Sequence, residues 1–250
     1  MLRYYISENM KIKNTLVQKL TFIAPVSVIL LSVLLTRNYF QIDIYNWWYT
    51  LIIPAGLPLI CSLLFKIDGG KKKNRGVLGL YVDLKKVWMA KVFTGVSIIA
   101  VSTLLIFIAA QLVVYIIPFK SAYPIPLKDG AIATVLIIIT TAWQVPLYIF
   151  ISRKIGMVIS VILGMSISIG SIPISTENMW WLCPFSYTSR IMCPILKILP
   201  NGLMAVPESV TFKPELLNVS SVGFAVIVTI ILFLVITILT GRLYENVEAR

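Results

Sequence analysis

The chain has 250 residues, of which 58% are hydrophobic and only 13% are charged, and its mean hydropathy is +0.92. A soluble domain carries a charge on roughly a quarter of its residues, so this composition excludes a soluble globular protein and indicates one embedded in a membrane. The formal net charge is +12. We interpret it as a topology signal and as attraction to anionic lipid headgroups, and not as a sign of nucleic-acid binding.

Apolar stretches divide the chain into candidate membrane spans, each of which needs about 20 predominantly apolar residues. Backbone polar groups in lipid must be satisfied within the segment, so each span is expected to be an α-helix. The predicted fold class is therefore all-α: a polytopic membrane protein with one transmembrane domain, residues 1–250. The six expected transmembrane helices are Val17–Thr36, Trp47–Phe65, Val92–Ile117, Ala131–Ile151, Ile155–Ile174 and Val219–Thr240.

The distribution of Lys and Arg predicts which way these spans face. Sixteen of the 22 lie before or near the start of the first span, between spans 2 and 3, between spans 4 and 5, or after the last span. Because cytoplasmic loops carry the excess of Lys and Arg, both termini are expected to be cytoplasmic. Residues 66–91 are then the large cytoplasmic loop, 37–46 a ten-residue outer loop, and 175–218 the long extracellular loop.

Two segments on the cytoplasmic side have internal patterns. Residues 1–16 carry a weak amphipathic pattern, which fits either a helix lying in the membrane plane or a plain basic tail. In the loop 66–91, Asp68-Gly69-Gly70 is expected to end one helix and Asp83 to cap the next. The apolar segment 74–82 between them would suit docking of a soluble subunit. It would equally suit an ordinary positive-inside loop whose apolar side chains face lipid.

The fifth span carries a small residue at every fourth position. Such a stripe lets another helix backbone approach closely, which is how helices associate in lipid. It predicts either packing within one bundle or a seam between subunits. The helix-packing residues are Gly156, Ser160, Gly164 and Ser168.

The extracellular loop 175–218 is long and apolar, and its apolar pieces are each interrupted by proline. Pieces of half a span or less predict short re-entrant or interfacial helices. Aromatic side chains at this outer mouth would contact a cationic amphipathic substrate or would form an aromatic belt among the headgroups. The candidates are Trp180, Trp181, Phe185 and Tyr187. Cys183 and Cys193 lie ten residues apart, and a disulfide between them stays an open possibility.

Several kinds of catalytic chemistry are missing from the sequence. There is no histidine, no phosphate-binding Gly-x-x-x-x-Gly-Lys-Ser/Thr motif and no Gly-x-Ser-x-Gly motif. The expected spans contain no Asp, Glu or Arg, whereas ion-coupled carriers place ionisable groups there. We therefore expect no catalytic residue, no metal site, no cofactor and no enzymatic activity. Energy for any transport must come from a separate subunit.

Three short motifs resemble one family of permeases. They are PLICSLLF at 58–65, KKVWMAK at 85–91 and WWLCP at 180–184, the last followed by Pro194-Ile195 and ILPNG at 198–202. With six spans and a basic loop between spans 2 and 3, the chain resembles permease subunits of bacterial lantibiotic-protection (immunity) ABC transporters, within the type-2 ABC exporter family. Tyr81-Val82-Asp83 departs from the pattern, since relatives usually have a Leu-Pro-small turn there.

The resemblance implies a complex in the bacterial cell membrane, with two permease subunits, often non-identical, on a pair of cytoplasmic ATPase subunits. This complex would expel cationic antimicrobial peptides from the lipid bilayer. The resemblance assigns ATPase coupling to Asp68, Arg75, Leu78, Leu80, Tyr81 and Val82, with Arg153 and Lys154 as a second contact. Two alternatives stay open: a type-2 ABC permease that exports another amphipathic substrate, such as a lipid or a drug, and a membrane protein that sequesters peptide without transporting it.

Overall fold

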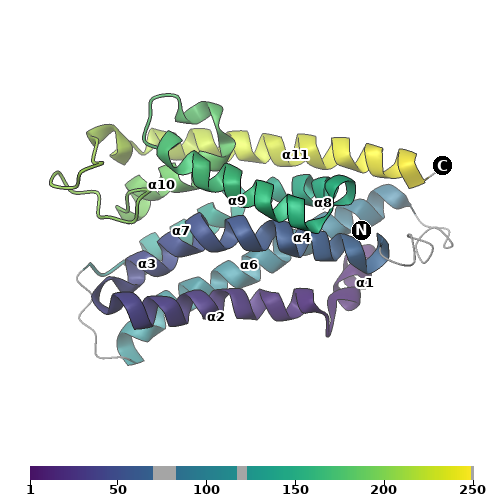
Figure 1. Cartoon of the computed structure of the whole chain (residues 1–250), viewed down its shortest axis with the longest axis horizontal. Coiled ribbons are helices and arrows are strands. Elements are labelled where there is room, and N and C mark those ends of the chain that lie inside the picture. Colours follow the sequence, from purple (N-terminus) through teal and green to yellow (C-terminus); the bar gives the residue numbers. More distant parts are fainter. Residues whose placement is uncertain (70–82, 117–122, 249–250) are drawn as a thin grey trace.

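The computed structural model describes residues 1–69, 83–116 and 123–248, and these form a bundle whose long helices run side by side (Figure 1). Within those ranges the regular secondary structure is helical apart from one isolated β-bridge between Ile198 and Met204, so the all-α class is confirmed. The helices are α1 (Leu2–Ile12), α2 (Leu16–Thr36), α3 (Phe40–Trp47), α4 (Ile53–Gly69), α6 (Leu84–Ile116), α7 (Leu127–Ala142), α8 (Gln144–Ile155), α9 (Met157–Ile174), α10 (Tyr187–Leu196) and α11 (Ser220–Glu248). Short helical turns cover Arg37–Tyr39, Trp48–Ile52, Trp180–Leu182, Pro184–Ser186 and Pro214–Leu217.

Five helical stretches of the described residues are long and apolar enough to cross a membrane. They are Leu16–Asp68, Leu84–Val113, Leu127–Ile155, Met157–Ile174 and Ser220–Glu245. The first is 53 residues long and folds back on itself at the turn Arg37–Tyr39, so that α2 lies alongside α4 (Figure 1). Each of the remaining four covers most of one of the expected spans 3 to 6.

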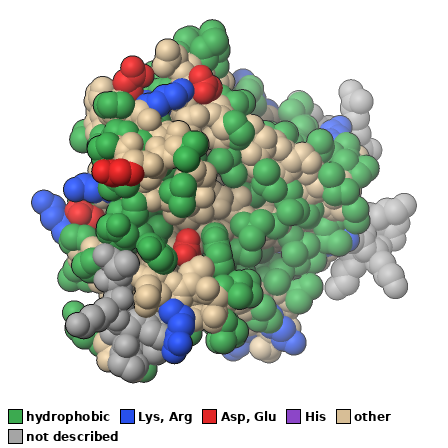
Figure 2. Space-filling view, turned by 60° about the vertical axis from the view of Figure 1, so that its left-hand side comes forward, with side chains coloured by type: hydrophobic (Ala, Val, Ile, Leu, Met, Phe, Trp, Pro, Cys, Tyr) green, Lys and Arg blue, Asp and Glu red, His purple; other side chains and the backbone are tan. Residues whose placement is uncertain are grey.

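The flanks of the bundle are apolar, as expected for a protein embedded in a membrane. Figure 2 shows hydrophobic side chains over much of the face in view, with charged side chains gathered mainly toward its edges. Leucine and isoleucine side chains that point outward from the middle of α2, α9 and α11 are about half exposed; examples are Leu30, Ile162 and Leu234. An extended apolar surface of this kind marks a face that lipid or another protein covers.

The two ends of the bundle carry different elements. One end, the "α1 end", holds α1, the end of α4, the start of α6, the turn between α8 and α9, and the end of α11 (Figure 1). The opposite end, the "α10 end", holds α3, α10 and the loop that follows α10. α1 lies across the bundle rather than along it (Figure 1). Of the two alternatives for residues 1–16, the structure therefore has the helix and not the plain basic tail.

The expected outer loop 37–46 is mostly helical, which corrects the sequence-based boundary at Trp47. α3 joins α4 through the π-helical turn Trp48–Ile52. Polar residues lower the hydropathy of α3, but their side chains are satisfied inside the protein. The amide of Gln41 donates to the Ala110 carbonyl at 2.9 Å and accepts from the backbone N–H of Ile125 at 3.1 Å.

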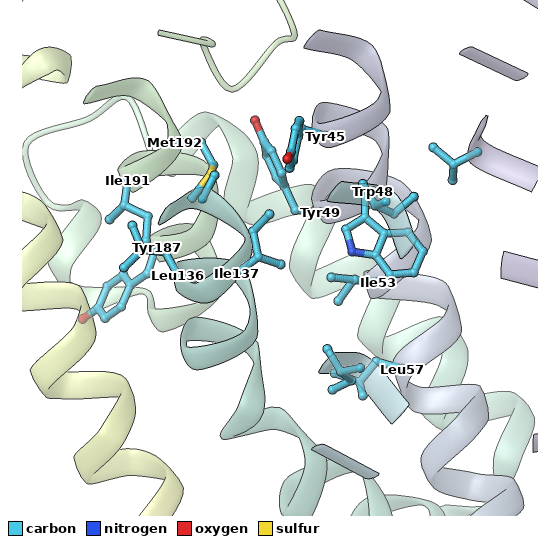
Figure 3. Packing of buried hydrophobic residues seen from close by; sticks show 14 of the residues in the cluster. Tyr45, Trp48, Tyr49, Ile53, Leu57, Leu136, Ile137, Tyr187, Ile191 and Met192 are labelled. Atoms are coloured by element: carbon cyan, nitrogen blue, oxygen red, sulfur yellow. The ribbon is translucent and has the colours of Figure 1, made fainter. Parts of the chain in front are cut away.

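The hydrophobic core lies where this broken helix meets α7 and α10. Figure 3 shows Tyr49 and Ile137 between α3–α4 on one side and Met192 of α10 on the other. The indole N–H of Trp48 donates to the hydroxyl of Thr103 on α6 at 3.1 Å, so α6 is attached to the same core.

The small-residue stripe of α9 packs against α4 of the same chain. Ser160 and Gly164 are buried, and a Cβ atom at position 164 would collide with the Pro58 ring. Ser168 is half-buried, while Gly156 is exposed and joins α8 to α9 with φ +86°. Of the two interpretations, packing within one bundle is therefore the use made of Ser160 and Gly164.

Candidate functional site

Four ionisable side chains from three helices meet at the α1 end, and we call them the ion cluster: Glu8, Lys11, Asp68 and Lys91. The ammonium of Lys91 lies 2.8 Å from a Glu8 carboxylate oxygen and 2.7 Å from an Asp68 oxygen. Lys11 pairs with Glu8 and lies 3.1 Å from Asp68. Lys91 also donates to the Leu64 carbonyl at 3.3 Å. Two cations and two anions thus alternate, and each charge touches two of the opposite sign.

Local sequence explains how the cluster forms. Glu8 and Lys11 are three residues apart on α1 and therefore share a face. Asp68 is in the last turn of α4 and Lys91 in the early part of α6. The ion pair between them therefore joins the two helix ends that flank residues 70–82. Lys91 is 2% exposed and Glu8 is 5% exposed. At such burial, a charge left without its partner is strongly unfavourable.

The charges of the cluster also act on the pKa of Lys11. Burial of the side chain works to lower this pKa, but the hydrogen bond and charge of Glu8, followed by the charge of Asp68, outweigh burial. The pKa of Lys11 is therefore raised above its ordinary value, and the ammonium stays charged within the cluster.

A second set of contacts ties α6, α8 and α11 together beside the cluster. Lys85 and Glu245 form an exposed ion pair at 3.1 Å, and the Trp88 and Tyr244 rings lie 5.2 Å apart. The Arg153 guanidinium is half-buried, 5.3 Å from the centre of the Tyr244 ring. Five segments of the bundle therefore interlock at the α1 end.

Asp83 caps α6 as expected from the sequence. Its carboxylate accepts the backbone N–H groups of Lys85 and Lys86 at 3.0 and 3.2 Å, as an N-cap does. The hydrogen bond from the Lys86 side chain, then the one from the Lys86 backbone, hold the pKa of Asp83 below its ordinary value.

The predicted coupling residues are thus divided. Asp68 is in the ion cluster, Arg153 lies against the aromatic rings of α4 and α11, and Lys154 is exposed. The other predicted coupling residues lie outside the described residues: Arg75, Leu78, Leu80, Tyr81 and Val82.

Sequence reasoning missed Glu8, Lys11 and Lys91 as partners of Asp68. The available signal was Glu8, the one acidic residue among the first 40.

At the α10 end, the four aromatic candidates have different environments. Tyr187 is buried and half-buried Trp180 packs on it, with ring centres 5.4 Å apart. Phe185 is half-buried against Trp143, with ring centres 4.8 Å apart. Trp181 is 50% exposed. Three of the four therefore pack within the protein, and Trp181 is the candidate with a largely exposed ring.

The same region contains a buried arginine whose role the sequence did not indicate. Arg190 is 7% exposed and donates to the carbonyls of Ser175 at 3.1 Å and Glu215 at 3.0 Å. Its guanidinium lies 5.4 Å from the centre of the Trp180 ring, a cation–π distance. Burial lowers the pKa of Arg190 from its ordinary value. One side chain thus holds three parts of the loop 175–218 together.

Cysteine chemistry adds nothing at this end. Cys183 and Cys193 are both free thiols in the structure, so they do not form the disulfide left open by the sequence. Burial raises the pKa of Cys193 to about 12, which keeps it a neutral thiol.

A small polar-lined pocket lies beneath the α10 end, between α4, α7, α8, α9 and α10. It has room for no more than about one water molecule, so it is far too small for a peptide. Its polar lining is supplied by Tyr49, Thr50, Thr141, Gln144, Ser168, Thr188 and Ser189.

Comparison of the chain with protein-family models, with curated proteins and with solved structures gives no match in any of the three.

Proposed function

We propose that this chain is the membrane-spanning permease subunit of a type-2 ABC exporter and that a separate ATPase subunit supplies the energy. Five long apolar helical stretches support membrane insertion. In this proposal α2 and α3–α4 cross separately, which makes six crossings. The α1 end is cytoplasmic because the excess of Lys and Arg belongs to it.

One observation carries the proposal: the α1 end joins both helix ends that flank residues 70–82 to three other segments of the bundle. The Asp68–Lys91 pair links α4 to α6, and the Lys85–Glu245 pair links α6 to α11. A partner that pushed on 70–82 would therefore move several helices at once. Arg153 and Lys154, at the end of α8, are available as the second contact.

The proposed substrate is a cationic antimicrobial peptide of the lantibiotic class, expelled from the membrane to give resistance. This assignment rests on the family resemblance. Three exposed apolar side chains at the α10 end also support it: Met179, Trp181 and Leu182, which are 50–63% exposed. Such a surface suits the apolar side of an amphipathic peptide, and the Trp181 ring suits its cationic groups.

The decisive experiment combines purification with a resistance assay. The tagged chain is purified from its own bacterium in mild detergent, and we expect an ATPase subunit and a second permease subunit to co-elute. Growth is then measured against lantibiotics, membrane-active lipids and drugs. Cells carrying Leu78→Glu together with Leu80→Glu should lose peptide resistance, although the protein still reaches the membrane.

A matched control introduces the same charge at the opposite end. Val210 is 94% exposed at the α10 end, so Val210→Glu should leave both ATPase association and resistance intact. Full resistance in the Leu78/Leu80 double variant would contradict the coupling role. Resistance to lipids or drugs alone would reassign the substrate, and absence of any ATPase subunit would favour a sequestering protein.

A further inference from the structure

The N-terminal helix α1 packs with its polar side inward. Glu8 is buried in the ion cluster, the Tyr5 hydroxyl is 2.7 Å from that of Ser97, and the Asn9 amide donates to Thr94 at 3.4 Å. The apolar side chains of the same helix point outward: Leu2 is 72%, Ile6 49% and Met10 70% exposed. A surface helix in water shows the reverse arrangement.

The exposed side of α1 fits a lipid surface in both charge and continuity. Glu8 is the only acidic residue among the first 20 and its charge is neutralised in the cluster, so the exposed charges there are all basic: Arg3, Lys13 and Lys19. Basic side chains beside an apolar stripe are attracted to anionic headgroups. The exposed apolar side chains also continue into α2, at Leu16 and Phe22.

We propose that the ion cluster is an orienting clamp, which fixes the rotation of α1 so that Leu2, Ile6 and Met10 lie in the anionic surface of the bilayer. Rotating α1 to bury these three side chains would carry Glu8 away from Lys91. Lys11, on the same helix, would move away from Asp68 together with Glu8. Lys91 and Asp68 would keep each other, but each would lose one of its two charged partners while staying buried, which is unfavourable. The clamp thus connects the membrane surface to the helix ends on either side of residues 70–82.

The first test measures the depth of α1 in the full chain, reconstituted in nanodiscs that contain phosphatidylglycerol. A spin label is attached to cysteine at Met10→Cys or at Ser7→Cys, in a Cys183→Ser background, because Cys61 and Cys193 are buried. Ser7 is also exposed and lies at the border of the apolar stripe, farther from its centre than Met10 is. Collisions with oxygen, which concentrates in lipid, are compared with collisions with a water-soluble nickel chelate.

We expect a higher oxygen-to-nickel collision ratio at position 10 than at position 7. Equal ratios, or nickel access at position 10 as high as at position 7, would overturn the proposal, and a soluble partner would then be the better occupant of the apolar face. This comparison needs no variant of the cluster, so it remains decisive even where such a variant fails to fold.

The second test breaks the clamp. In Lys91→Met the difference between positions 10 and 7 should disappear, and in the milder Glu8→Gln it should shrink. Lys85→Met removes the same charge from the same helix, but from an exposed pair, and should leave the difference unchanged. An unchanged depth of position 10 in a folded Lys91→Met would overturn the clamp. Neither test depends on an ATPase or on transport, so failure here is distinguishable from failure of the proposed function.

Discussion

The two ends of the bundle are closed in different ways. At the α1 end, Lys91 pairs with Glu8, which is 83 residues away in the chain, and with Asp68, 23 residues away. At the α10 end, Arg190 bonds to carbonyls only 15 and 25 residues away. The first arrangement joins separate helices of the bundle through paired charges, whereas the second folds a single loop onto itself with neutral acceptors.

This difference teaches which end can transmit motion. Ion pairs between helices couple the positions of those helices, because moving one helix alone exposes or strands a buried charge. The α10 end is held by aromatic packing and by hydrogen bonds to neutral groups, those of Gln41 between segments and those of Arg190 within residues 175–218, so we expect it to respond less to the movement of one helix. The predictions that follow test this contrast, from the largest expected effect to the smallest.

Removal of the central charge of the cluster should have the largest effect. Lys91→Met leaves Glu8 and Asp68 buried with one cation between them, and we expect a loss of about 3–5 kcal/mol in the free energy of unfolding. Thermal unfolding in detergent measures it. Lys85→Met, which breaks the exposed pair with Glu245, should cost no more than about 1 kcal/mol. Similar losses in the two variants would contradict the special position of Lys91.

Removal of the buried guanidinium should have a local effect at the other end. Arg190→Met deletes two charged hydrogen bonds to carbonyls, and we expect a loss of about 2–3 kcal/mol. Limited proteolysis should show faster cleavage within 175–218, while the depth of a spin label at position 10 stays unchanged. Lys128→Met, at an exposed position of the same end, serves as the control. A change in the depth of α1 would show that the two ends are not independent.

Overpacking between α4 and α9 tests the structure shared by both ends. A Cβ at Gly164 would collide with the Pro58 ring and lie 3.2 Å from the Pro54 carbonyl oxygen, so Gly164→Ala should destabilise by about 1–3 kcal/mol. Gly170 has no atom within 4 Å of its Cβ position. Gly170→Ala in the same helix should therefore stabilise slightly, by up to about 1 kcal/mol. Thermal unfolding should show a lower midpoint for Gly164→Ala and a slightly higher one for Gly170→Ala. A shift in the same direction for both variants would contradict the close contact between Gly164 and α4.

The cap of α6 should give the smallest effect and a defined pH dependence. Asp83→Ala should cost about 1 kcal/mol, whereas Asp83→Asn keeps the cap and should cost less. Because the pKa of Asp83 is lowered in the folded protein, its contribution is present above the ordinary value of 3.8 and is lost as the pH falls through the folded value. The difference in unfolding free energy between the parent chain and Asp83→Ala should therefore be present at neutral pH and shrink at acidic pH.

Features that depend on neighbouring residues were accessible from the sequence. The expected span Val17–Thr36 differs from α2 by one residue at its start, and Asp83 caps α6 as predicted. Hydropathy failed at α3, because Gln41 lowers the local average although its side chain is bonded to two distant backbone groups. The aromatic candidates of the outer loop also needed the fold, since burial of Tyr187 depends on packing with Trp180 and Phe224.

By itself, the sequence determined that this protein is helical, apolar enough for a membrane and more basic in some loops than in others. Hydrophobic length, charge counts and caps are properties of short segments, so no partner is needed to recognise them. Only the tertiary structure decided that Lys91, one of many basic residues in a basic loop, is a buried ion joined to Glu8 across 83 residues. The physical reason is that pairing and burial depend on which helices meet.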